Sequence, residues 1–246
     1  MGLTVTVLGC SGTYAGAGGA CSGYLVRGGG ATVLLDAGAG TLANLQEHVR
    51  PDELDAVVVS HSHPDHWVEV PVLRNALTYV LGRGDVPLYT TAETLGLVEA
   101  VGHGRIGGAF RPPIVTDGPG FRVGPLSFRC SRTDHPPETL AVRVDLGGRS
   151  LGYTADTGPG WSLAELGPGL DLAFTEATFL TSDHDPGDPV HLTAAQAGAA
   201  ARDAGVGHLV VTHVLPTRSV DEAVAEAAET YGAPVEAARV HRTYRV

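Results

Sequence analysis

The sequence predicts an α/β fold, organised as one layered domain over residues 1–246. Segments that alternate like strands and segments with helical spacing are interleaved along the whole chain, and no linker separates them. Apolar residues make up 43% of the composition and charged residues 17%, which is enough apolar material for a sizeable core. The chain shows no internal repeat strong enough to interpret.

In the first half of the chain, turn residues separate the predicted elements. Gly28-Gly29-Gly30 predicts a hairpin between the second and third strands. Residues 56–60 form an apolar run, typical of a strand buried on both faces. The strands are expected at 3–8, 22–27, 31–36, 56–60 and 87–89, and the helices at 41–49, 64–81 and 92–101.

The second half begins with residues 102–120, which are rich in glycine and proline and fit no regular element. A mobile flap is one interpretation of this stretch. Thr193 is the expected N-cap of an alanine-rich helix, and residues 234–240 are expected to close the fold. The strands are expected at 121–129, 141–146, 150–153, 172–175 and 209–212, and the helices at 193–204 and 220–231.

The formal net charge of −11 argues against a protein that binds extended RNA or DNA, because such proteins are usually basic over the contact face. It leaves room for a small phosphate-bearing substrate. The basic residues are all arginine, which we attribute to a GC-rich genome rather than to function. The apolar runs are too short to cross a bilayer and the N-terminus lacks a basic leader, so no membrane partner is expected.

The three cysteines, Cys10, Cys21 and Cys130, form no C-x-x-C pair, which makes a cysteine-rich zinc knuckle an unsuitable interpretation. An odd number of cysteines without an export signal fits reduced, buried thiols and a cytoplasmic location.

The run His61-Ser62-His63-Pro64-Asp65-His66 follows a predicted buried strand and indicates a metal site. Alternate residues of an extended segment point the same way, so His61 and His63 can reach one metal together. The chain then turns, and Asp65 and His66 face a second metal at the start of the next helix. Imidazole and carboxylate ligands suit zinc, manganese or iron.

Further ligands are needed to complete two metal sites. His135, Asp156 and His213 each lie just after a predicted strand, at the edge of an apolar run. A single histidine in such a position is more often a satisfied core or loop residue. The three together, in a chain that already has the histidine run, favour a joint metal site.

The whole chain resembles the metallo-β-lactamase superfamily, and within it the ribonuclease Z-like branch without the tRNA-binding arm. The resemblance implies a four-layer αββα sandwich with the site at one edge, between the sheets. It rests on the histidine run and on Leu34-Leu35-Asp36-Ala37-Gly38, Tyr153-Thr154-Ala155-Asp156-Thr157, Thr175-Glu176-Ala177-Thr178-Phe179, His191-Leu192-Thr193 and Thr212-His213.

The resemblance also implies the ligand set and the cofactor, two divalent metal ions. Zinc is expected, with manganese or iron as alternatives. A hydroxide between two such ions would attack the substrate. Asp65 and His191 are the expected catalytic residues, because the resemblance places His191 near the scissile phosphate. By the same resemblance the first metal is held by His61, His63 and His135, the second by Asp65, His66 and His213, and Asp156 bridges the two.

Several other residues keep two interpretations. Asp36 and Glu176 either orient metal-bound histidines through the second N–H or make ordinary structural hydrogen bonds. His184 either touches substrate or lies on a surface loop, and Arg218 either meets a phosphate or is simply exposed. Gly9-Cys10-Ser11-Gly12 either presents backbone N–H groups to the site or is only a tight turn. His208 is expected to be structural, and no role is assigned to His48, His103 or His241.

Three features disfavour a tRNA 3′-processing endonuclease. Only residues 136–155 separate His135 from Asp156, which is too short for the tRNA-binding arm of that group. The basic loop of the group is missing, and Val214-Leu215-Pro216-Thr217-Arg218 replaces its usual sequence after the last histidine. Among armless relatives the chain is most similar to the actinobacterial atypical class II cyclic-AMP phosphodiesterases, through Leu8-Gly9-Cys10-Ser11-Gly12, Ser22-Gly23-Tyr24-Leu25 and residues 191–198.

The expected function is therefore hydrolysis of a small-molecule phosphodiester, with a cyclic nucleotide as the first candidate. The alternatives are a carboxylic-ester, lactone or thioester hydrolase on the same site, and a non-catalytic metal-binding protein. A di-iron redox role is disfavoured because no flavin or rubredoxin module is attached. Relatives are often dimers, so a homodimer is also expected.

Overall fold

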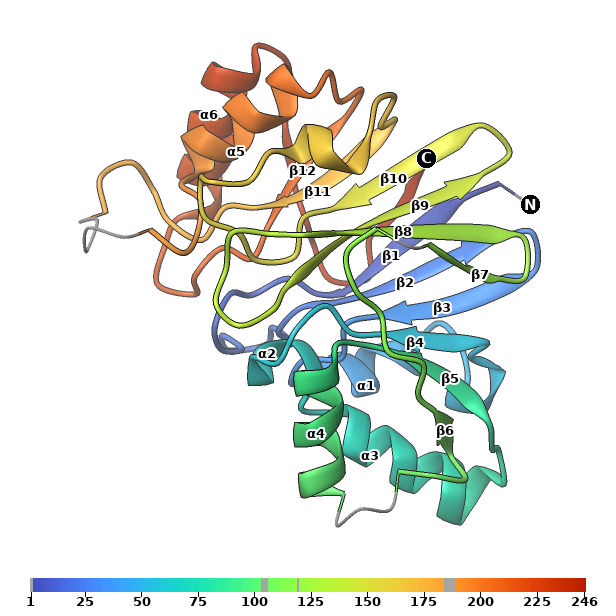
Figure 1. The fold of residues 1–246 in the computed structure, drawn as a ribbon. Helices are drawn as coiled ribbons and strands as arrows, with labels where there is room; N and C mark the ends of the chain where they lie inside the picture. Colours follow the sequence, from blue (N-terminus) through green and yellow to red (C-terminus); the bar gives the residue numbers. More distant parts are fainter. Residues whose placement is uncertain (1, 103–105, 119, 184–188) are drawn as a thin grey trace.

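The computed structural model describes residues 2–102, 106–118, 120–183 and 189–246 and contains two mixed sheets that pack face to face (Figure 1). The first sheet has the order β14-β1-β2-β3-β4-β5-β6. Its strands are β1 (Thr4–Gly9), β2 (Gly23–Gly28), β3 (Ala31–Leu35), β4 (Ala56–Val58), β5 (Val86–Tyr89), β6 (Phe110–Arg111) and β14 (Thr243–Arg245).

The second sheet has the order β13-β12-β11-β10-β9-β8-β7. Its strands are β7 (Phe121–Val123), β8 (Leu126–Arg132), β9 (Leu140–Leu146), β10 (Arg149–Tyr153), β11 (Leu172–Glu176), β12 (Leu209–Thr212) and β13 (Glu236–Ala237).

Helices cover the outer face of each sheet (Figure 1). The first sheet carries α1 (Thr41–Leu45), η1 (Pro51–Glu53), α2 (Pro64–Trp67), α3 (Val70–Asn75), the π-helical turn η2 (Ala76–Leu81) and α4 (Ala92–Val101). The second sheet carries η3 (Leu163–Leu166), α5 (Ala194–Asp203) and α6 (Val220–Tyr231). Among the described residues, no helix is both long enough and apolar enough to cross a membrane.

Three apolar clusters fill the spaces between the four layers of helices and sheets. Alternating strand residues explain the central layer: Val7 and Val33 of the first sheet belong to the same apolar cluster as Phe128 and Val144 of the second. The opposite faces of the same strands pack against the helices, forming one outer layer with α5 and α6 and another with α1 to α4. This arrangement confirms the predicted four-layer αββα sandwich.

Parallel strands place the metal candidates at one edge of the sandwich. The strands β3, β4 and β5 run parallel in the first sheet, and β10, β11 and β12 run parallel in the second. Their carboxyl ends therefore lie together at one edge of each sheet. The segments that follow these strands carry most of the candidate ligands.

The predicted helix over residues 64–81 is wrong as a single element, because the structure divides it into α2, α3 and η2. The break coincides with Glu69, whose backbone N–H donates to Ala37 O, and with Pro71, which has no N–H to continue the ladder. The Glu69 carboxylate instead accepts from Gly40 N and Leu42 N and so satisfies the first turn of α1.

Four other parts of the chain differ from the prediction. The expected strand over residues 121–129 is a hairpin, because Gly124 has a positive φ of 54° and Pro125 follows it. The helix predicted over residues 41–49 ends at Leu45. The stretch 102–120 contains β6, which pairs with β5, and its interpretation as a mobile flap lies partly on residues 103–105 and 119, outside the described residues. The closing segment forms β13 and then β14, which was not predicted.

Helices α5 and α6 approach each other at a glycine, and this contact provides a stability prediction. A Cβ at Gly198 would overlap the carbonyl oxygen of Ala227 and the hydroxyl of Thr230. We expect Gly198→Ala to lower the free energy of unfolding by about 1–3 kcal/mol, because the two helices must separate. The control is Gly96→Ala in α4, where a Cβ meets no atom within 4 Å. This substitution should raise the free energy of unfolding by roughly 0.5–1 kcal/mol. Urea titration checks both, and equal midpoints for the two variants would contradict the close-contact argument.

Candidate metal centre

The seven predicted ligands converge at the shared edge of the two sheets. His61 and His63 follow β4, and Asp65 and His66 lie in α2. The other three follow strands of the second sheet, His135 after β8, Asp156 after β10 and His213 after β12. Their nitrogen and oxygen atoms form two groups, within each of which they lie no more than 4.8 Å apart: His61, His63, His135 and Asp156, and Asp65, His66 and His213.

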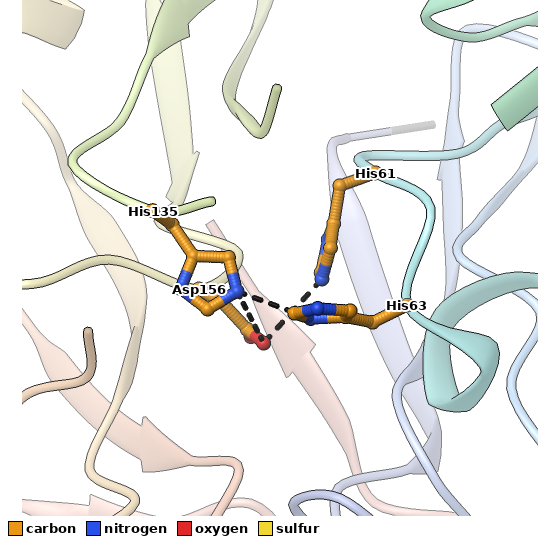
Figure 2. A group of neighbouring side chains, drawn as sticks. All are labelled: His61, His63, His135 and Asp156. Carbon is orange, nitrogen blue, oxygen red and sulfur yellow. Dashed lines mark hydrogen bonds and ion pairs between the residues drawn. The ribbon is translucent and has the colours of Figure 1, made fainter. Parts of the chain in front are cut away.

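Figure 2 shows the first group, in which three imidazole rings and one carboxylate point toward a common centre. His135 Nε2 lies 3.1 Å from His63 Nδ1 and 3.8 Å from Asp156 Oδ2. His61 Nε2 lies 3.5 Å from the same carboxylate oxygen. One ring therefore presents Nδ1 to the centre and the other two present Nε2.

The second group lies on the other side of the Asp156 carboxylate. His66 Nε2 and His213 Nε2 are 3.3 Å apart, and Asp65 Oδ2 lies 3.3 Å from the latter. Asp156 Oδ1 is 3.3 Å from His66 Nε2 and 3.5 Å from His213 Nε2. The two oxygens of Asp156 thus face different ligand groups.

The chemistry of these atoms fits two divalent cations. Within the described part of the chain, His61 Nε2 and Asp156 Oδ1 are buried and have no hydrogen-bond partner. An unsatisfied buried polar atom costs about 1–3 kcal/mol, and a cation between the ligands would satisfy both atoms. The ligands are imidazoles and carboxylates, which suit zinc, manganese or iron. The cysteines are unpaired thiols and belong to neither group.

The electrostatics of the cluster favour the cation-binding forms of His61 and Asp156. Burial lowers the pKa of His61 to about 4, which keeps this imidazole neutral. Burial would raise the pKa of Asp156, but His213, His66 and His61 outweigh it and hold that pKa well below its usual range. Burial would lower the pKa of His66, but the Asp156 and Asp36 carboxylates outweigh burial and raise that pKa well above its usual value. Without a metal ion these carboxylates therefore keep a proton on His66, and a bound cation would take the place of that proton.

Two buried carboxylates support the cluster from opposite sheets. Asp36, which follows β3, accepts from His66 Nδ1 at 2.8 Å, the orienting contact that the sequence suggested. Glu176, at the end of β11, differs from that expectation. It accepts from His191 Nδ1 at 2.9 Å, and it reaches His213 only through the hydroxyl of Thr178.

His191 lies beside the second group. One of its ring nitrogens is within 4.8 Å of ligand atoms of Asp156 and His213, and its ring centroid is 4.9 Å from that of His135. Burial would lower the pKa of His191, but the Glu176 carboxylate outweighs burial and raises that pKa to about 9. A cationic imidazole next to the centre can donate a proton.

Of the residues with two interpretations, Arg218 pairs with Asp183 through Nε at 2.7 Å, which gives no support to a phosphate contact. The turn at 9–12 lies against His213, since a Cβ on Gly12 would come within 3.0 Å of His213 Nδ1, but the Gly12 N–H donates to Val214 O. The next backbone N–H, that of Thr13, donates to Asp65 Oδ2 at 2.9 Å. His208 forms an ion pair with Glu236 at 3.0 Å, in keeping with a structural role. The candidates His184 and His103 lie outside the described residues.

Sequence reasoning missed three side chains that contact the supporting carboxylates. Tyr153 donates its hydroxyl to Asp36 Oδ2 at 2.8 Å from the opposite sheet. Ser60 contacts Asp36 and His61, and Thr178 contacts Glu176 and His213. Ser60 directly precedes His61, which offered a local signal. No sequence pattern indicated that Tyr153 would reach Asp36.

Comparisons with known proteins agree with this fold. Residues 31–214 match the sequence model of the β-lactamase superfamily domain. An uncharacterized protein of Mycobacterium tuberculosis is 34% identical over 99% of this chain and 92% of its own length. The probable metallo-hydrolase YhfI of Bacillus subtilis is 33% identical over 93% of both chains, and its crystal structure aligns over 99% of both with a TM-score of 0.90 and 27% identity. Ribonuclease Z of Streptomyces avermitilis is 27% identical over 92% of this chain and 91% of its own.

Proposed function

The chain belongs to the β-lactamase superfamily, in its ribonuclease Z-like group of metal-dependent hydrolases, and from this premise we propose that it is a dinuclear phosphodiesterase for small substrates. A 3′,5′-cyclic nucleotide is the first candidate substrate. The observation that carries the proposal is the pair of ligand groups on the two sides of the Asp156 carboxylate, with His191 beside them.

The ligand groups support a pair of divalent ions close enough together to act on one phosphate. Such ions, when bound, supply Lewis acidity and lower the pKa of a water molecule that attacks phosphorus. The first would be held by His61, His63 and His135, the second by Asp65, His66 and His213. Asp156 would contact both.

The chain's own residues supply the remaining steps. Glu176 accepts from Nδ1 of His191, so Nε2 is the ring nitrogen left to donate a proton. Hydrolysis of a cyclic nucleotide forms a P–O bond to the attacking water and breaks one P–O bond to the ribose, and the departing ribose alkoxide needs that proton. Thr13 N–H donates to Asp65 Oδ2 and fixes the direction of its carboxylate. Because Asp65 then faces His213, its position also supports the second ion.

Two features support a small substrate over an RNA. Residues 136–155 between two of the ligands include β9 and β10, which leaves no room for an inserted arm. The net charge of −11 also disfavours a long polyanion. A phosphodiester is supported by the likeness to a ribonuclease Z, since a ribonuclease cleaves this bond.

The test is hydrolysis by the purified chain after loading with zinc or manganese. We expect turnover of bis-p-nitrophenyl phosphate and of at least one 3′,5′-cyclic nucleotide, together with two ions per chain by metal analysis. A lactone and a thioester are included in the same assay. Clear turnover of either of these without phosphodiester turnover would overturn the proposal in favour of a carboxylic-ester class hydrolase.

A further inference from the structure

We propose that the hydroxyl groups of Ser60 and Thr178 are positioning groups, which determine the ring nitrogen that His61 and His213 direct to the metal centre. An imidazole binds a cation only through a nitrogen without a proton, so the tautomer matters at each ligand. The inference rests on the metal-binding part of the proposed function and is independent of the substrate.

Ser60 lies between a carboxylate and a histidine. Its Oγ is 2.9 Å from Asp36 Oδ2 and 3.0 Å from His61 Nδ1. A carboxylate only accepts, so the single hydroxyl proton goes to Asp36, and the serine oxygen must accept from His61 Nδ1–H. The lone pair of His61 is then on Nε2, which is the buried atom without a hydrogen-bond partner among the described residues.

The imidazole of His66 does not compete with His61 for the Ser60 hydroxyl. His66 Nδ1 is 3.5 Å from Ser60 Oγ but only 2.8 Å from Asp36 Oδ2, so its proton goes to the carboxylate. Asp36 also accepts from the backbone N–H of Ser60 at 2.8 Å and from Tyr153 at 2.8 Å. These donors fix the carboxylate that in turn orients the serine hydroxyl.

Thr178 repeats the arrangement in the second sheet. Its Oγ1 lies 2.5 Å from Glu176 Oε2 and 2.8 Å from His213 Nδ1. The threonine proton goes to the carboxylate, and the threonine oxygen accepts from His213 Nδ1–H. His213 Nε2 is therefore the nitrogen without a proton, and it faces Asp65 and Asp156.

The two hydroxyls thus act on different ligand groups, Ser60 through His61 on the first and Thr178 through His213 on the second. Other rings do not depend on a hydroxyl: His66 donates to Asp36 directly, and His135 Nδ1 donates to Val190 O at 2.7 Å. Without the hydroxyl, a neutral imidazole can place its proton on Nε2 and lose the lone pair that the cation needs. Supporting groups of this kind typically change metal affinity by 10–100-fold.

The chain offers matched controls for removing each hydroxyl. Thr175 and Ser22 are buried, and their hydroxyl oxygens have no hydrogen-bond partner within the described residues. We expect Thr178→Val and Ser60→Ala each to weaken binding of one zinc ion by about 10–100-fold, measured by chelator competition. Thr175→Val and Ser22→Ala should stay near the parent affinity. Thr178→Ser keeps the hydroxyl and should restore the affinity that the valine variant loses.

A spectroscopic measurement separates tautomer control from general loss of structure. Long-range ¹H–¹⁵N NMR of the metal-free protein should show a protonated Nδ1 for His61 and His213 in the parent chain. The signal of His213 should move toward the Nε2–H form in Thr178→Val and return in Thr178→Ser. Parental zinc affinity and an unchanged tautomer in Thr178→Val and Ser60→Ala would overturn the inference. If the parent chain itself bound no zinc, the proposed metalloenzyme function would fail, while the NMR comparison would still decide the hydroxyl role.

Discussion

Replacing Asp156 with asparagine should prevent binding of both metal ions and lower the hydrolysis rate by at least about 10³-fold. The reason is the position of its carboxylate, whose two oxygens face His61 on one side and His66 and His213 on the other. A neutral amide of the same size removes the negative charge that both ions share. Metal analysis and assay of the parent substrate check the expectation.

Asp145 provides the control for this substitution. It lies on β9, away from the centre, where it accepts from Arg143 and Ser150. Asp145→Asn makes the same chemical change and should leave two ions and nearly the parental rate. An Asp156→Asn chain that kept two tightly bound ions would contradict the assignment of this carboxylate as the bridge.

Replacing His191 with asparagine should lower kcat by about 10²–10⁴-fold for a cyclic nucleotide, with both ions still bound. The loss should be much smaller for bis-p-nitrophenyl phosphate, because p-nitrophenolate leaves without a proton. A structural role for this histidine would instead reduce both rates equally. His208→Asn serves as the control, since that histidine pairs with Glu236 at the surface and has no part in the site.

The pH dependence offers an independent check of His191. Burial would lower its pKa, but Glu176 outweighs burial and raises the pKa to about 9. The protonated form is present below that pKa, so the rate with a cyclic nucleotide should fall as the pH rises through it. Glu176→Gln removes the charge that stabilises the imidazolium, so the alkaline limb should move to lower pH. A limb that stays in place would show that another group donates the proton.

The sequence predicted where the candidate ligands converge better than it predicted the helices around them. The histidine run follows a short buried strand, and parallel strands end at one edge, so candidates such as Asp156 and His213 were expected to meet there. Helical spacing over residues 64–81 could not reveal the break at Glu69, because the backbone N–H of Glu69 donates to Ala37 O and its carboxylate accepts from the start of α1, and both partners are distant in the sequence. Local patterns do not contain such contacts.

The supporting hydrogen bonds were the least predictable part of the site. The contact between Tyr153 and Asp36 joins β10 of the second sheet to the end of β3 in the first, and it depends on how the sheets are stacked. The role expected for Glu176 was also incomplete, because Thr178 lies between it and His213. A sequence identifies polar residues near a strand end, but only the packing decides which one receives which proton.

The last strand of the chain has a consequence for the order in which the protein folds. After β13 pairs in the second sheet, the chain crosses to the first, where Arg245 of β14 lies opposite Thr4 of β1. Closing so long a loop has a high entropic cost before any contact repays it. We therefore infer that this pairing forms late, when the two halves have already collapsed onto each other. Strand β14 then joins the C-terminal end of the chain to the first sheet, so slow local unfolding of the native protein should begin at β14.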